Sequence, residues 1–317
     1  MEVLMKKLVS LFLFSFIALP LAALGSDNDL DVSIIRSHYS FKMPKLTDWF
    51  SGNKTAVKQK GDLSGFKISY TRHNIMKEYF DLEDDVFIKL EGEYLSGKVD
   101  QTNAFMGYPQ DFAMPGSIKD VKVREYDFRF LAGQAYQFGG GLWELTPYMG
   151  LGYHQVTTRP TVWFMGLDTL YFVPSDWSKM KQFYVPLGMN FSFKPTDRVQ
   201  LKVGGEFDGV IHGSYTMDAK ALPPPPLTFG GRDYDKRHNP QATQHGWGFR
   251  LNARAEIGYK YVSVFVEPFY NYWKSVGDGE AVMYSKSTPE GNALWYLRNW
   301  IPNHVTKEYG LRAGVRF

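Results

Sequence analysis

The sequence contains no cysteine and carries little net charge. Without cysteine, neither disulfide bonds nor thiol chemistry can contribute to the fold or to an activity. A formal net charge of +3 over 317 residues is too small to indicate a nucleic-acid partner, and we expect none. After Leu24 no apolar run approaches the ~20 residues that a membrane-spanning helix requires. These absences argue against a disulfide-stabilised domain, a nucleic-acid-binding protein and a bundle of membrane helices.

The amino-terminal segment has the three parts of a secretory signal peptide. Two lysines precede an apolar run, Leu8–Leu24, which ends among small residues. A spanning helix is the competing interpretation, and Pro20 argues against it because proline interrupts the run. We therefore expect residues 1–25 to be a cleaved signal peptide and residues 26–317 to form one exported domain.

The last segment, His304–Phe317, alternates between two kinds of side chain. One face is apolar and comprises Val305, Tyr309, Leu311, Ala313, Val315 and Phe317. The other face is charged, polar or glycine and comprises Thr306, Glu308, Gly310, Arg312, Gly314 and Arg316. Successive side chains of a strand point to opposite sides, so this pattern predicts a strand with lipid on one side and a polar lumen on the other. We expect Tyr309, Leu311, Val315 and Phe317 to act as the insertion signal that the barrel-assembly machinery reads.

Similar two-faced segments recur along the chain. They are Val32–Phe41, Phe66–Arg72, Val86–Tyr94, Tyr126–Phe138, Leu145–Val156, Phe183–Phe193, Val199–Tyr215, Trp247–Lys260 and Val262–Trp273. With the last segment they predict an all-β protein, a transmembrane antiparallel up-and-down β-barrel of ten strands, with eight or twelve as alternatives. A soluble β-sandwich alternates in the same way. The signal peptide and the aromatic strand ends favour the barrel, because aromatic residues mark both membrane interfaces.

The connections between these segments alternate between short and long. The long ones lie near 42–62, 98–122, 157–180, 217–244 and 276–303. Outer-membrane barrels have short periplasmic turns and long external loops, so we expect both termini in the periplasm and a candidate surface for an external ligand at the long loops. Pro186 lies inside an expected strand and cannot donate a ladder hydrogen bond, which predicts a bulge or local break.

The expected inward positions carry charges of both signs. The lumen network that we predict comprises Glu91, Glu93, Asp127, Arg129, Lys202, Glu206, Arg250, Arg254, Glu256, Glu308, Arg312 and Arg316. About eight strands leave an interior that side chains can fill, whereas sixteen to eighteen leave an aqueous channel. Ten strands therefore predict a narrow or occluded lumen filled by paired charges, with a small conductance as the alternative.

Few residues are candidates for chemistry. Asp208 and His212 both fall on expected inward positions, with Glu206 deeper, and an acid beside an imidazole can activate water as a general base. Membership of the lumen network is the stronger interpretation of these residues, since ion-pair networks produce the same clusters. The histidines show no spacing that specifies a metal, and we expect neither a metal nor a cofactor.

Several phrases in the expected strands are similar to those of outer-membrane, porin-like β-barrel proteins of Gram-negative bacteria. They are Tyr94–Asp100, Thr146–Tyr153, Glu267–Trp273 and Glu308–Phe317. The resemblance implies an outer-membrane location, with lipid and lipopolysaccharide as surroundings, and it implies no active site. The chain also resembles the omptins, which are ten-stranded outer-membrane proteases, in architecture only. Their aspartate–histidine dyad is spaced by one residue, whereas three residues separate Asp208 from His212.

From these observations we expect a non-enzymatic barrel with a structural or surface-interaction role. A small porin-like channel is one alternative. A barrel-embedded hydrolase that uses Asp208 and His212 is the other.

Overall fold

A computed structural model describes most of the exported domain. The described residues are 28–47, 54–75, 85–106, 113–159, 161–165, 170–174, 178–217, 241–259, 262–278, 280–283, 297–300 and 303–317. The expected signal peptide, residues 1–25, lies outside them. In the described part of the chain, no helix has the length and apolar character to cross a membrane.

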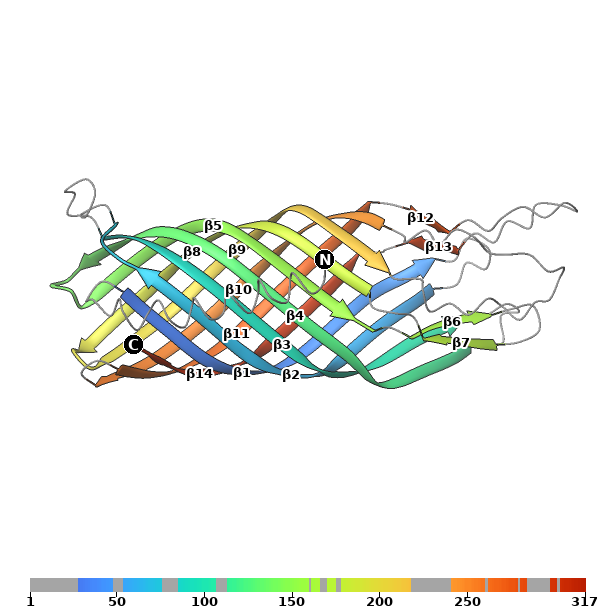
Figure 1. Cartoon of the computed structure of the whole chain (residues 1–317), viewed down its shortest axis with the longest axis horizontal. Coiled ribbons are helices and arrows are strands. Elements are labelled where there is room, and N and C mark those ends of the chain that lie inside the picture. Colours follow the sequence, from blue (N-terminus) through green and yellow to red (C-terminus); the bar gives the residue numbers. More distant parts are fainter. Residues whose placement is uncertain are drawn as a thin grey trace, which may run out of the picture.

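Ten strands form one closed antiparallel barrel (Figure 1). They are β1 (Asn28–Thr47), β2 (Lys54–Arg72), β3 (Asp85–Met106), β4 (Ala113–Phe138), β5 (Trp143–Thr158), β8 (Ser178–Thr196), β9 (Val199–Met217), β10 (Gln241–Tyr259), β11 (Val262–Asp278) and β14 (His304–Arg316). Each strand pairs with its neighbour along the barrel order, and β1 closes the cylinder by pairing with β14. The prediction of a ten-stranded up-and-down barrel is confirmed.

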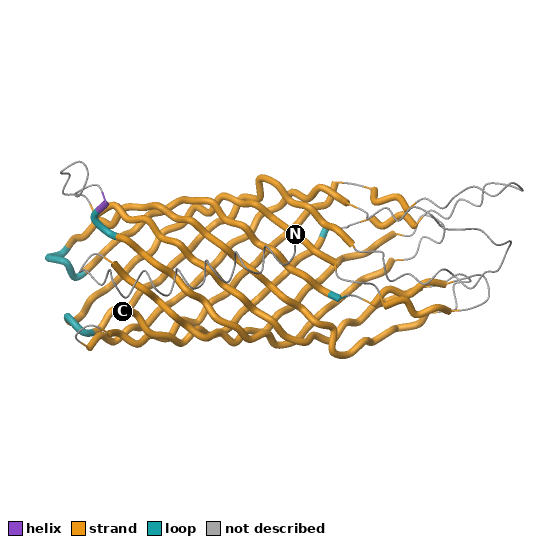
Figure 2. The backbone as a smooth tube through the Cα atoms, viewed as in Figure 1, coloured by secondary structure: helices purple, strands orange, loops and turns teal. Residues whose placement is uncertain are grey.

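Both ends of the described chain meet at one end of the barrel. The backbones of Leu30 and Phe317 exchange hydrogen bonds of 3.1 and 3.0 Å there. Tight connections also lie at this end, at residues 139–142 between β4 and β5 and at residues 197–198 between β8 and β9. We call this the near end, on the left in Figure 2, and the opposite one the far end.

Several strands continue well past the segments that the sequence predicted. β1 and β2 remain paired as far as Thr47 and Lys54, and β3 and β4 as far as Met106 and Ala113. The expected loops at 42–62 and 98–122 are therefore largely strand. The expected loop at 157–180 contains a hairpin of β6 (Thr161–Met165) and β7 (Leu170–Pro174).

The remaining long connections are described only in part. The segment at 276–303 contains β12 (Glu280–Met283) paired with β13 (Leu297–Trp300). Of the connection at 217–244, residues 218–240 lie outside the described part of the chain. The two small hairpins lie beyond the barrel wall at the far end (Figure 1).

The half of the barrel next to the near end has an apolar outer surface. Its exposed side chains include Ile34, Phe128, Leu151, Leu187, Val203, Leu251, Val264 and Leu311. Aromatic side chains bound this surface on both sides. Towards the far end lies the boundary belt, which we define as Phe66, Tyr94, Tyr126, Tyr153 and Phe183, with ring pairs 4.9 to 5.8 Å apart. At the near end Trp143 stacks on Phe193 at 4.2 Å and on Phe191 at 5.2 Å.

Beyond the boundary belt the two faces exchange character. The inward side chains there form an apolar cluster of Ile35, Tyr39, Leu63, Leu95, Val99, Val121, Val123, Val156, Met180 and Phe269. The outward positions carry exposed charges, among them Lys58, Lys60, Asp62, Lys98, Asp100 and Lys122. We call the part on the near side of the belt the near half and the part beyond it the far half. Period-two alternation continues through both halves, which is why strand pairing extends past the apolar outer surface.

Candidate functional site

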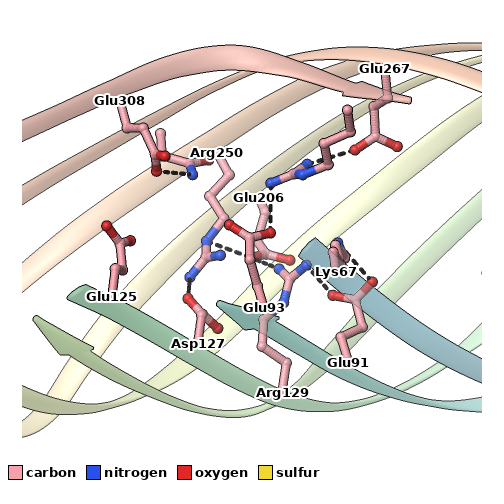
Figure 3. Close-up of polar contacts among 12 residues, drawn as sticks. Lys67, Glu91, Glu93, Glu125, Asp127, Arg129, Glu206, Arg250, Glu267 and Glu308 are labelled. Carbon is pink, nitrogen blue, oxygen red and sulfur yellow. Dashed lines mark hydrogen bonds and ion pairs between the residues drawn. The ribbon is translucent and has the colours of Figure 1, made fainter. Parts of the chain in front are cut away.

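The lumen of the near half holds a network of buried ion pairs that joins most of the barrel strands. Glu91 on β3 accepts from Lys67 at 3.1 Å, from Lys89 at 2.8 Å and from Arg129 on β4. Arg129 also reaches Glu206 on β9 at 2.6 Å. Arg129 therefore connects the neighbouring strands β3 and β4 to β9, which is distant in the sequence (Figure 3).

Arg250 on β10 lies at the centre of this network. Its guanidinium donates to Asp208 at 2.8 Å and to Asp127 at 2.6 Å, and it lies 3.3 Å from Glu206. The Tyr184 hydroxyl donates to Asp127 at 2.8 Å, and Arg250 donates to that hydroxyl at 2.7 Å. Each of these charges around Arg250 has a partner of opposite sign, the condition under which charge is tolerated in a protein interior.

A glycine makes the position of Tyr184 possible. The Tyr184 ring lies against Gly152 on the neighbouring strand β5, and a Cβ on that glycine would overlap the ring. The absence of a side chain therefore leaves the space in which the tyrosine reaches across to Asp127. Trp273 covers the same region, edge-on to Tyr184 and 5.1 Å from the Arg250 guanidinium.

A further arginine extends the network to β14, the strand that closes the barrel. Arg312 on β14 donates to Glu267 at 2.6 Å and to Glu93 at 3.0 Å, with its guanidinium over the Phe269 ring. Asn271 donates to Glu308 at 3.2 Å. Figure 3 shows Glu308 and Glu125 on the same side of Arg250.

At the near end, the carboxylate of Asp31 on β1 accepts hydrogen bonds from two arginines. Arg254 and Arg316 each donate to it at 2.7 Å. Glu256 binds the same two guanidinium groups, at 2.8 Å from Arg254 and 3.4 Å from Arg316. These contacts fasten β1, β10 and β14 together across the point where the barrel closes.

Of the predicted network residues, all except Lys202 take part in an ion pair or hydrogen bond within this lumen. Lys202 points inward on β9, but it forms no ion pair with a described residue. The network also includes Asp31, Tyr184, Trp273 and Gln182, which sequence reasoning did not select. The alternation along each strand places these residues inward. Nothing else in the sequence marks a single inward polar or aromatic residue as a member of the network.

A second chain of polar contacts crosses the lumen where the charged network meets the apolar cluster. His154 lies 2.9 Å from Glu125 and 3.3 Å from Gln182, and Gln182 donates to Ser275 at 2.7 Å. His154 stacks on Trp273 with ring centroids 4.9 Å apart. All of these side chains are buried, so the acid–imidazole pair has no access for a substrate.

The catalytic candidates do not come together. Asp208 is buried inside the lumen and bound to Arg250, whereas His212 is exposed on the outside of the barrel. The expectation that both side chains point inward was wrong. The reason is a bulge on β9: Phe183 pairs with His212 and Tyr184 with Val210, so Ile211 is an extra residue. One extra residue reverses the facing of every side chain that follows.

The bulge is close to the break that Pro186 predicted. Pro186 faces Asp208 on β9, two residues from the register shift. The irregularity therefore falls on the partner strand of the proline.

Inward side chains of β1 are buried from the near end into the far half. Along β1 the inward residues Asp31, Ser33, Ile35, Ser37 and Tyr39 are only 1 to 8% exposed. One cavity of about 30 Å³ lies among lumen residues that include Lys67, Glu91 and Arg312. Such a cavity holds about one to two water molecules.

No described group of three or more histidine, aspartate or glutamate side chains is arranged to hold a metal ion.

Comparison with known proteins gives the fold. No family model matches the chain, and no curated protein sequence matches it. Among solved structures, the outer membrane protease OmpT from Escherichia coli matches with a TM-score of 0.57 and 12% identity, over 93% of this chain and 97% of that one. Ail of Yersinia pestis (TM-score 0.31, 8% identity, 92% and 99% covered) and a FadL homologue of Pseudomonas aeruginosa (0.33, 9%, 92% and 90%) are more distant. This chain has the fold of an outer-membrane β-barrel.

Proposed function

We propose that the chain is an integral protein of the bacterial outer membrane with both termini in the periplasm. The exposed apolar surface of the near half, bounded by aromatic residues, supports this location because barrels show such a band to lipid. At the near end tight turns join β4 to β5 and β8 to β9. At the far end several strands extend well beyond the apolar outer surface and a long connection joins β9 to β10, which matches periplasmic turns and external loops. An amino-terminal signal peptide would deliver the chain, and the outward residues of β14, with Phe317, would guide its assembly.

We further propose that the barrel is a non-enzymatic protein with a closed lumen, acting as a structural or surface-interaction element. The observation that carries this proposal is the unbroken burial of the inward side chains along β1. In an open channel these positions would line water. The paired charges around Arg250 and the apolar cluster beyond them occupy that space.

Planar-bilayer recording tests the closed lumen. We expect the refolded protein to give no reproducible ion steps under conditions in which an open sixteen-stranded porin, reconstituted in parallel, conducts. Swelling of liposomes in small sugars gives an independent measurement of the same property. Reproducible steps from the wild-type barrel would reject the closed lumen in favour of the alternative, a small porin-like channel.

A peptidase and esterase panel tests the non-enzymatic assignment. The opposite facing of Asp208 and His212 supports the expectation that the folded barrel hydrolyses none of the substrates, because a general base must lie within hydrogen-bond reach of its partner. Hydrolysis that disappears in the His212→Ala variant, while the barrel still folds, would reject it. An activity that persists in His212→Ala would reject the non-enzymatic role and also exclude the dyad.

A further inference from the structure

Two histidines lie next to each other on the outer surface of the barrel, on neighbouring strands. His212 on β9 and His245 on β10 are both exposed. The ladder between these strands passes from Gln244 to Gly246 on β10, and over the same step β9 contains two residues, Ile211 and His212. His245 is therefore the β10 residue that stands opposite His212.

The bulge of β9 brings His212 to this position. The same extra residue appears on the other side of β9, where Phe183 of β8 pairs with His212 and Tyr184 pairs with Val210. Ile211 is 61% exposed, and His212 after it is exposed on the same face. Unbroken alternation would have turned His212 into the lumen. Bulges are found next to functional sites because they redirect a side chain in this way.

The spacing across the two strands suits a shared ligand. Side chains that face each other on one side of an antiparallel pair have Cβ atoms about 4.5–5.5 Å apart. Two imidazole nitrogens bound to one transition-metal ion, each at about 2.0–2.1 Å, lie about 3 Å from each other in tetrahedral geometry. Two opposed imidazole rings extend beyond their Cβ atoms and can converge over this difference.

His212 lacks the partner that other described histidines have. His154, His38 and His73 lie 2.9, 3.1 and 3.3 Å from a carboxylate. No hydrogen bond or ion pair joins His212 to another described residue. A neutral imidazole always has one ring nitrogen with a lone pair, and at an exposed site that nitrogen is available to a ligand from solution.

We infer that His212 and His245 together bind one divalent transition-metal ion. Imidazole is a preferred ligand of copper, zinc and nickel, and Cu²⁺ binds most tightly in this series. A two-histidine site has fewer protein ligands than the three-residue groups that are absent from the described part of the chain, so water completes the coordination. The inference depends neither on the closed lumen nor on the proposed location.

Titration of the untagged, detergent-solubilised barrel with Cu²⁺ tests this inference. Quenching of tryptophan fluorescence reports binding, because Trp247 is two residues from His245 on the same strand. EPR spectroscopy of the bound Cu²⁺ counts the imidazole nitrogens that ligate it. The test variants are His212→Ala and His245→Ala. The matched control is His38→Ala, which removes a histidine from the outside of β1. Altered electrophoretic migration of unheated samples confirms that each variant folds.

We expect wild type and His38→Ala to bind one Cu²⁺ through two histidine nitrogens. Either test variant should bind Cu²⁺ roughly 100-fold more weakly, because the second imidazole no longer adds an intramolecular contact. Its EPR spectrum should show one histidine nitrogen. Equal affinities of the wild type and both test variants would reject the inference, as would the same loss in His38→Ala. Displacement of the ion by excess Ca²⁺ would also reject it, since Ca²⁺ takes oxygen ligands and the site would then be built from carboxylates.

Deletion of Ile211 tests the contribution of the bulge while every histidine stays in the chain. Without the extra residue, alternation returns His212 to the lumen side, so the folded deletion variant should bind Cu²⁺ as weakly as His212→Ala. Wild-type affinity in a folded deletion variant would show that the ion is bound elsewhere and would reject the inference. If the deletion prevents folding, the two alanine variants still decide the question.

Discussion

The near half and the far half of the barrel use the same strands with opposite faces. In the near half charged side chains point inward and apolar ones outward, as at Arg250 and Leu251 on β10. In the far half Val99 and Val121 point inward, and Lys98 and Lys122 point outward. The strands continue across the boundary belt, with a bulge on β9 opposite the belt residue Phe183. What changes is the medium outside, which in the proposed location is lipid for the near half and water for the far half.

The difference shows how each half is stabilised. The far half has the arrangement of a soluble barrel, in which the transfer of apolar side chains from water to the interior favours folding. In lipid the outer surface of the near half gains little from this effect, because the surroundings are as apolar as a protein core. Its interior is instead held by ion pairs and hydrogen bonds, which are strong where water is excluded but costly when one partner is lost. Substitutions in the two halves should therefore destabilise the barrel for different reasons.

The largest effect is expected at the centre of the charged network. Arg250→Met leaves Asp127, Asp208 and Glu206 buried without their common cation, and removal of one partner from a buried pair costs about 3–5 kcal/mol. Urea unfolding in detergent, followed by tryptophan fluorescence, measures the loss. The control is Arg36→Met, because Arg36 is 79% exposed and its 3.6 Å pair with Asp62 should contribute about 0–1 kcal/mol. If both variants lose the same stability, the network does not hold the near half.

A leucine comparison tests the apolar cluster of the far half. Leu95 is fully buried in that cluster, whereas Leu311 is 48% exposed on the outside of the near half. Leu95→Ala should cost about 2–5 kcal/mol through lost burial and the cavity that remains. Leu311→Ala opens no cavity and should cost clearly less under the same urea titration. A larger loss at Leu311 would contradict the exchange of faces between the two halves.

A lysine introduced on the outer surface locates the boundary between the halves. Val203 is 59% exposed on β9 in the near half, and Thr102 is exposed on β3 in the far half. Val203→Lys should cost about 2–4 kcal/mol if the site is near the bilayer midplane, because a charge is then placed in lipid. Thr102→Lys should be close to neutral, since its surroundings are aqueous. The comparison uses folding titrations into lipid vesicles. Equal losses of folding free energy at the two positions would contradict the assignment of the outer surface of the near half to lipid.

The barrel could be predicted from the sequence because period-two alternation is a local signal. Each of the ten strands contains enough alternating residues to be recognised alone. The alternation is clearest in the segment that ends at Phe317. The extensions at 42–62 and 98–122 were missed for a related reason. Strands were predicted where apolar residues occupy the outward positions. In the far half the alternation continues, but there the apolar residues point inward and the charged residues point outward. Lys98, Val99 and Asp100 show that reversed pattern.

The site was predictable as a set of inward residues but not as a set of contacts. Arg250 and Asp127 are 123 positions apart, and their 2.6 Å contact depends on the tilt and stagger of the closed barrel. The facing of His212 depends on the bulge at Ile211, and nothing in the local sequence of β9 marks that extra residue. Alternation therefore identifies inward charges reliably only in stretches of strand without a bulge.

The smallest effect is expected at an exposed pair in the far half, where water weakens charge interactions. Asp62 accepts a hydrogen bond from His38 at 3.1 Å, and this contact holds the pKa of Asp62 below its ordinary value of 3.8. A carboxyl whose pKa is lower in the folded state stabilises the fold above its unfolded pKa, and the stabilisation is lost as the pH falls through the folded pKa. The stability difference between wild type and Asp62→Asn should thus be small at neutral pH, begin to decrease as the pH approaches 3.8, and vanish below the lowered pKa of Asp62. High salt should shrink it further, because exposed pairs are screened. A difference that grows with acidity would mean that folding raises the pKa of Asp62, contrary to an exposed carboxylate that accepts a hydrogen bond from His38 on the outer surface of the far half.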